Sequence, residues 1–260
     1  MSALRQLKQF VRDRRISVAT RNRLSQLIVD SVLATSPYLV RPNFDTIHPD
    51  DILLLFELYD ENYFQNLLHR NLDPQAISFR LSNRMTRAGG KTTRWSNARQ
   101  GQQPRYEIAV STTLLFESFR DPERHITVTG LPCDNRLQAL MRIMEHELVH
   151  LIEMMVWNDS SCARPRFQGI ASRVFGHTDH HHDLMTPVEL ASSQFGIRPG
   201  VRVRFDYNGH SLEGVVNRVT KRATVLVADP DGQTYSDGRR YVKFYVPPQN
   251  LEAIPTAEQE

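Results

Sequence analysis

The chain has 260 residues, of which 40% are hydrophobic and 23% charged, a composition typical of a globular protein with one large or two modest domains. No apolar run approaches the roughly 20 residues that span a membrane, and the first residues lack the apolar stretch of a signal peptide, so we expect neither membrane insertion nor export. Two cysteines are too few for a disulfide framework, so we expect a cytoplasmic protein, and the net charge of +3 gives only a weak preference for acidic partners.

Residues 1–45 are predicted to form a basic, helical N-terminal segment. Apolar residues recur at helical spacing from Leu4 to Val11, and a second helix is predicted over residues 21–33. Residues 1–24 contain seven basic residues and one acid. A solvated helix face is the simpler explanation of this charge, and contact with DNA is the alternative.

Residues 46–190 are predicted to form an α+β domain. A helix is expected over Asp50–Leu68, because a proline and two acids suit its N-terminal end. Alternation of apolar and polar residues predicts strands near residues 77–81 and 105–111, which are expected to form a small antiparallel sheet. The longest predicted helix covers about Asn135–Val156 and carries a buried stripe of leucine and methionine.

From about residue 198 onward, short strands alternate with Asn-Gly and Asp-Gly turns. This spacing predicts an all-β small barrel over residues 198–255 that resembles SH3, KOW and Tudor domains. Between residues 198 and 245, nine basic residues and six aromatic residues are interleaved with five acids. In one interpretation half of the aromatic residues fill the core and the arginines are solvated; in the other the surface binds DNA or a protein partner.

A His-Glu-x-x-His motif carries the clearest chemical signal. His146 and His150 are one helical turn apart, so both imidazoles project from one face of the predicted helix, as two ligands of a tetrahedral Zn²⁺ ion do. Glu147 lies beside the first histidine, where its carboxylate can take a proton from a water that zinc acidifies. Glu153 shares this face and is expected to orient a histidine or to make an ion pair. The motif predicts a zinc-dependent metalloendopeptidase with a protein substrate.

Around this motif the chain resembles the SprT-like zinc metallopeptidases, the family that includes the Spartan DNA–protein crosslink proteases. The similarity covers roughly residues 48–187 and includes the stretch Ile108-Ala109-Val110-Ser111 as well as the motif helix. It implies a helical zincin-type (minigluzincin-like) catalytic domain. The family's zinc ligands fall on His146 and His150, its catalytic glutamate falls on Glu147, and its substrates are proteins associated with DNA.

The third zinc ligand departs from the family pattern. Family members place a histidine at the start of the next helix, in a His-Gly-x-x-Phe stretch, and alignment on Phe167 puts Ala163 at that position. The neighbouring Cys162 is preferred as the ligand, since a thiolate binds zinc well, although a small buried hydrophobe is the alternative role. His177 is the rival at the far end of that helix, roughly 15 Å away at 1.5 Å per residue, so the two cannot hold one zinc together.

Two functions from different classes remain open at this point. The first is a zinc endopeptidase that the barrel or the basic N-terminal segment recruits to DNA or to a protein partner. The alternative is a nucleic-acid-binding or adaptor protein with a structural zinc site, because a zinc held by four protein ligands has no room for a catalytic water. His181 and His182, in a run of three histidines, are further candidates for completing the site.

Overall fold

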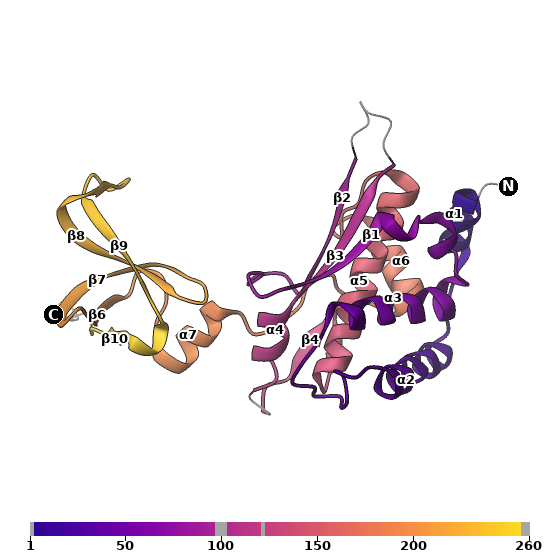
Figure 1. Ribbon diagram of the computed structural model, residues 1–260, viewed down its shortest axis with the longest axis horizontal. Coiled ribbons are helices and arrows are strands. Elements are labelled where there is room, and N and C mark those ends of the chain that lie inside the picture. The colour runs from indigo at the N-terminus through magenta and orange to yellow at the C-terminus, as the bar shows by residue number, and fades with distance from the viewer. Residues whose placement is uncertain (1–2, 97–102, 121–122, 256–260) are drawn as a thin grey trace. The chain divides into compact units, whose positions relative to one another are not determined.

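The computed structural model describes residues 3–96, 103–120 and 123–255, which belong to two compact units (Figure 1). The first unit is Met1–Leu184 and the second is Met185–Glu260. The fold is α+β, as predicted: the described residues form seven α-helices, a small mixed sheet, a two-stranded hairpin and a five-stranded antiparallel sheet. None of these helices is both long and apolar enough to cross a membrane.

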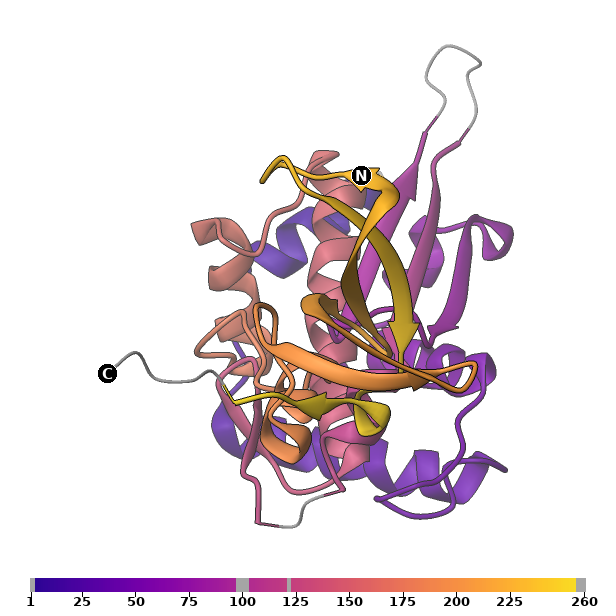
Figure 2. The same cartoon turned by 90° about the vertical axis from the view of Figure 1, so that its left-hand side faces the viewer.

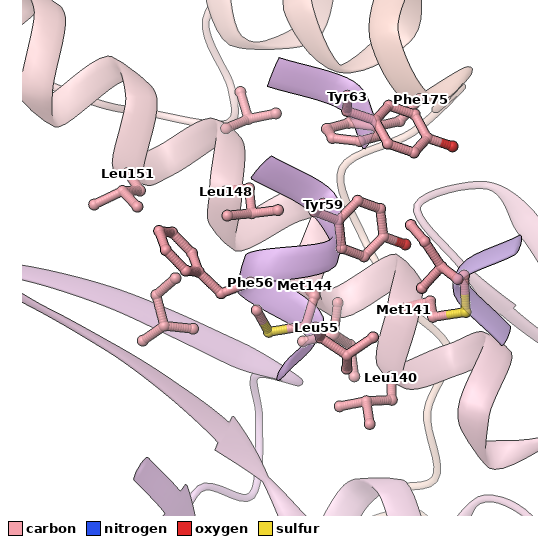
Figure 3. Close-up of a cluster of buried hydrophobic side chains, with 14 of the residues drawn as sticks. Leu55, Phe56, Tyr59, Tyr63, Leu140, Met141, Met144, Leu148, Leu151 and Phe175 are labelled. Atoms are coloured by element: carbon pink, nitrogen blue, oxygen red, sulfur yellow. The ribbon is translucent and has the colours of Figure 1, made fainter. Parts of the chain in front are cut away.

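The first unit is organised around α5 (Arg136–Trp157), which contacts the helices α1, α3, α4 and α6 and the sheet. The side chain of Asn135 caps α5 by accepting from the Gln138 amide, and Asn158 ends the helix in the left-handed conformation. Leucine and methionine side chains of α5 pack against α3 (Pro49–Phe64), and Figure 3 shows the centre of this core. The other helices are α1 (Ala3–Asp13), α2 (Val18–Thr35), α4 (Thr112–Glu117) and α6 (Pro165–Phe175), with 3₁₀ turns at His69–Asn71 and Pro74–Ala76.

Residues 1–45, predicted as a separate segment, contribute α1 and α2 to the core of the first unit. Leu7 of α1 and Ile28 of α2 are fully buried in the same apolar cluster as α5. Lys8 of α1 lies over the ring of Trp157, with its Nζ 5.9 Å from the ring centroid. The basic helices are therefore part of the first unit.

A three-stranded sheet in the order β1-β3-β2 lies beside α5. β1 (Ile77–Ser82) is parallel to β3 (Arg105–Ser111), whereas β2 (Gly90–Trp95) is antiparallel to β3, so the prediction of an antiparallel sheet is wrong. The chain reverses between β2 and β3, and β3 then lies between the other two strands, a pairing order that alternation along single strands cannot reveal. A separate hairpin pairs β4 (Ile126–Val128) with β5 (Leu131–Cys133).

The second unit begins with α7 (Pro187–Phe195), a helix that is not predicted from the sequence. The side chain of Thr186 accepts from the Glu189 amide, and the Glu189 carboxylate accepts in return from the Thr186 amide, which forms a capping box. Ala191 of α7 is buried with the apolar face of the C-terminal sheet.

The C-terminal sheet is antiparallel, in the order β10-β6-β7-β8-β9, and it is not closed into a barrel, so the predicted barrel is wrong. Because α7 and Ile197 pack on its apolar face, the sheet buries that face without closing on itself. Pairing shifts register once between β7 and β8 and once between β8 and β9, and Figure 2 shows the twist of β8 and β9. The strands are β6 (Arg202–Tyr207), β7 (His210–Val219), β8 (Ala223–Thr234), β9 (Arg240–Val246) and β10 (Glu252–Ala253), with a 3₁₀ turn at Pro248–Asn250.

Candidate metal centre

The structure brings His146, His150 and Cys162 together. The two histidines lie one turn apart on α5, and their Nε2 atoms are 3.2 Å from each other. Both rings pack on Phe167 of α6, with centroid separations of 4.8 and 4.5 Å. Cys162 lies in the turn between α5 and α6, and its Sγ belongs to a group of three donor atoms that all lie within 4.8 Å of one another.

This donor set fits zinc. Two imidazole nitrogens bound at 2.0–2.1 Å in a tetrahedral site lie about 3.3–3.4 Å apart, close to the 3.2 Å between His146 Nε2 and His150 Nε2. Burial, reinforced by neighbouring histidines, lowers the pKa of His146 to about 3, and burial lowers the pKa of His150 to about 4. Both imidazoles are therefore neutral near pH 7 and keep a lone pair for a metal ion.

A chain of hydrogen bonds fixes the ring of His150. Its Nδ1 lies 2.7 Å from Ser160 Oγ, and Ser160 Oγ donates to Glu153 Oε2 at 2.7 Å. The buried Glu153 carboxylate also pairs with Arg166, whose Nε is 2.5 Å from Oε1. Because the Ser160 proton goes to the carboxylate, Ser160 Oγ accepts from His150 Nδ1–H, and the lone pair of His150 is on Nε2, the atom that faces His146. Glu153 thus makes an ion pair with Arg166 and, through Ser160, orients His150, which are the two roles predicted for it.

Glu147 lies on the side of α5 that faces β2. Its Oε2 is 2.7 Å from the hydroxyl of Thr92, and that hydroxyl also lies 3.0 Å from the Glu147 carbonyl oxygen. Burial raises the pKa of the Glu147 carboxyl to about 7, against the opposing effect of the Thr92 hydrogen bond. Gly90 makes room for this carboxylate, because a Cβ at position 90 would lie 2.7 Å from both Cγ and Oε1 of Glu147.

A pocket of about 520 Å³ contains these groups. Its walls come from the start of β2, from α5 and from the segment 180–182. His146, Glu147, His150 and Cys162 all line it, so the donor atoms and the buried carboxylate face one space. A ligand in this pocket would therefore lie beside both the donor group and Glu147.

The structure places the rival histidine His177 elsewhere. Its Nε2 lies 2.8 Å from Glu145 Oε2, and the fully buried Glu145 carboxylate also accepts from Arg142 and from the hydroxyl of Tyr59. Burial alone would raise the pKa of Glu145, but Arg142 and His177 hold it below its usual value. This polar cluster ties α3, α5 and the end of α6 together, and His177 has a structural role in it.

His181 and His182 line the pocket without joining the donor group of the motif histidines. His182 Nε2 accepts from the Gly89 amide at 3.2 Å. His181 Nδ1 lies 2.9 Å from Asp179 Oδ1, and these two residues form a second group of possible metal donors with His180. Within the described part of the chain, Cys162 is thus the residue that completes the group of His146 and His150.

Comparison with models of known families, with curated proteins and with solved structures finds no match. The side chains of the site therefore carry the functional conclusion. Three residues of the site, Ser160, Thr92 and Gly90, have no motif signal in the sequence. Thr92 lies 55 positions from Glu147, and only the fold brings the two together.

Proposed function

We propose that this protein is a zinc metallopeptidase of the SprT-like type, in which His146, His150 and Cys162 hold Zn²⁺ and Glu147 is the general base. The observation that carries the proposal is the convergence of three zinc-type donor atoms and a buried carboxylate on one pocket. A zincin-type fold of the first unit is part of the proposal, since α5 presents the motif to a neighbouring edge strand.

When bound, zinc supplies a Lewis acid that lowers the pKa of water and polarises a peptide carbonyl. The chain itself moves the proton: the Glu147 carboxylate takes it from the attacking water and delivers it to the leaving amine. Thr92 orients that carboxylate through the contact at Oε2. Ser160 orients His150 so that its lone pair faces His146.

The strand β2 suits an extended peptide substrate. It is at the end of the sheet order, so one of its edges pairs with β3 and the other belongs to no strand pair among the described residues. A peptide that adds to such an edge gains main-chain hydrogen bonds regardless of its sequence. Gly89 and Gly90 line the pocket, so side chains do not block the approach of a peptide backbone there.

The second unit is proposed as a recruitment module for DNA or for a protein partner. Tyr207 and Tyr245 expose 50% and 63% of their surface, whereas Phe205 is buried in the core, so only some of the aromatic residues are taken up by packing. Arg202 and Arg204 pair with Glu213, which neutralises part of the basic surface of β6. Exposed tyrosines beside basic residues are suited to stacking and phosphate contacts.

The proposed base is tested by Glu147→Gln, which keeps the size of the side chain and removes its basicity. Purified wild type, Glu147→Gln and the matched control Glu57→Gln, an exposed position on α3, are incubated with unfolded casein after zinc loading. We expect one zinc per chain in all three proteins, and cleavage by wild type and Glu57→Gln only. Cleavage by Glu147→Gln at the wild-type rate would disprove the mechanism.

The ligand count separates the peptidase from an adaptor with structural zinc. Three protein donors leave one position of a tetrahedral ion open to water, and four close it. The donor group that contains the motif histidines has three members among the described residues, which favours the enzyme.

A further inference from the structure

The strand beside the proposed catalytic pocket belongs to a long stretch without acidic residues. Between Asp73 and Glu107 the sequence has seven arginines or lysines and no aspartate or glutamate. This stretch includes β1, the start of β3 and the whole of the edge strand β2. The substrate-facing edge of the sheet is therefore electropositive.

Two of these cations, Arg87 and Lys91, line the pocket itself. Both side chains are exposed, and no ion pair joins either of them to a carboxylate among the described residues. Arg80, from the same stretch, does form an ion pair, because its guanidinium lies 3.1 Å from the Glu107 carboxylate. Arg87 and Lys91 thus keep their positive charge available to a ligand in the pocket.

The rest of the lining does not offset this charge. Glu147 is the one carboxylate among the residues that line the pocket, and it lies against Thr92 on the α5 side. Asp179 is not among the residues that line the pocket, and its Oδ1 accepts from the amides of His180 and His181 and from the His181 ring. An anionic group entering the pocket therefore meets unpaired cations and little repulsion.

We propose that the site selects acidic polypeptide segments, with Arg87 and Lys91 binding aspartate or glutamate side chains next to the bond that is cut. This inference rests on the proposed peptidase function and names its substrate class. A polypeptide is favoured over a nucleic acid because the unpaired edge of β2 offers main-chain donors and acceptors beside the two cations, and an extended peptide matches both.

Binding is tested first, in a form that does not depend on cleavage. The zinc-loaded Glu147→Gln protein is titrated into two fluorescein-labelled peptides of alternating sequence, (Glu-Ala)₆ and (Gln-Ala)₆, and the anisotropy is followed. Two exposed charge pairs of this kind predict about 3- to 10-fold tighter binding of the glutamate peptide, a preference that 1 M NaCl removes. Adding Arg87→Gln and Lys91→Gln together should abolish the preference, whereas adding Arg84→Gln, an exposed arginine outside the pocket, should retain it.

Cleavage is tested next with a peptide library digested by wild type and by the Arg87→Gln/Lys91→Gln protein. Enrichment of aspartate and glutamate within three residues of the cut bonds in the wild-type digest, lost in the variant, is the expected result. Cleavage without acidic preference, together with equal binding of the two labelled peptides, overturns the inference and leaves the peptidase intact. Acid-selective binding without any cleavage overturns the peptidase and keeps the selectivity. A single-stranded oligonucleotide that displaces the glutamate peptide at lower concentration than the peptide itself would assign the two cations to nucleic acid and overturn the inference.

Discussion

Removal of the Ser160 hydroxyl is the smallest change expected to weaken the proposed metal centre while leaving every ligand in place. It joins His150 Nδ1 to Glu153 Oε2 through two contacts of 2.7 Å. Ser160→Ala removes the acceptor that holds the His150 ring, while Glu153 keeps its ion pair with Arg166 and a contact with the Ser161 amide. The fold should therefore tolerate the substitution, and the loss should fall on the metal ion.

Loss of an outer-shell partner of a metal-bound histidine typically weakens metal affinity by about 10- to 100-fold, which corresponds to about 1.4–2.7 kcal/mol. We expect a loss of this size in the zinc Kd of Ser160→Ala, measured by competition with a fluorescent chelator. Ser160→Thr keeps the hydroxyl and should bind zinc almost as tightly as wild type. Ser161→Ala is the matched control, because Ser161 contacts Glu153 through its backbone amide and not through its side chain.

Two outcomes would show that the Ser160 hydroxyl does not support the metal site. Equal zinc affinity of Ser160→Ala and wild type would show that the hydrogen-bond chain does not act on a bound metal. Equal weakening in Ser160→Ala and Ser161→Ala would show that the turn tolerates no substitution, so that the Ser160 hydroxyl has no special role.

Three further predictions concern other residues of the site. Gly90→Ala should lower kcat on the order of 100-fold at unchanged zinc affinity, because the new Cβ would lie 2.7 Å from the Glu147 side chain and displace it. Gly169→Ala on α6 should leave kcat unchanged, because a Cβ there comes within 3.4 Å only of the guanidinium of Arg173, at the far end of a long side chain. Full activity of Gly90→Ala would contradict the placement of Glu147. Thr92→Val should lower kcat by about tenfold with zinc retained, since the carboxylate loses a hydrogen bond, and a zinc-free Thr92→Val would show that Thr92 supports the metal site instead. His177→Ala should lower the free energy of unfolding by about 2 kcal/mol in urea titrations while keeping one zinc per chain, because His177 bonds the buried Glu145; loss of zinc would make it a ligand after all.

Local signals in the sequence predict the helices of the first unit well. The caps and the apolar stripe of α5 are local features of its own sequence, so they predict this helix directly. In the same way Pro49-Asp50-Asp51 indicates the start of α3, and Gly176 indicates the end of α6. α7 is not predicted from the sequence, although Thr186 and Glu189 have the spacing of a capping box. Its nine residues are too few to show a clear helical period beside the strand pattern that follows.

Pairing of strands is where prediction from the sequence fails. The alternation in β1 and β3 identifies both strands, yet it says nothing of β3 lying between β1 and β2. No strand is predicted between residues 81 and 105, whereas β2 begins at Gly90 and forms the edge of the sheet. The turns identify the C-terminal strands, but whether such a sheet closes depends on what covers its apolar face, and α7 covers it here.

The candidate site likewise contains some residues that the sequence predicts and others that only the fold reveals. His146, Glu147 and His150 are recognisable because a ligand spacing of four on a helix is a local property. The position of Cys162 before α6 predicts it as the third ligand, and the structure places its sulfur near the two histidines, so its role as a ligand stays a prediction with geometric support. Residues such as Thr92 and Ser160 act through contacts with side chains on other elements, which residue types and spacing alone do not specify.

Metal analysis and X-ray absorption at the zinc edge, on wild type and Cys162→Ala, would show whether His146, His150 and Cys162 hold a zinc ion. We predict one zinc per wild-type chain, with a sulfur shell near 2.3 Å that is absent from the variant. A nitrogen and oxygen shell that is the same in both proteins, or wild-type protein without stoichiometric zinc, would show that these three residues do not hold a zinc ion.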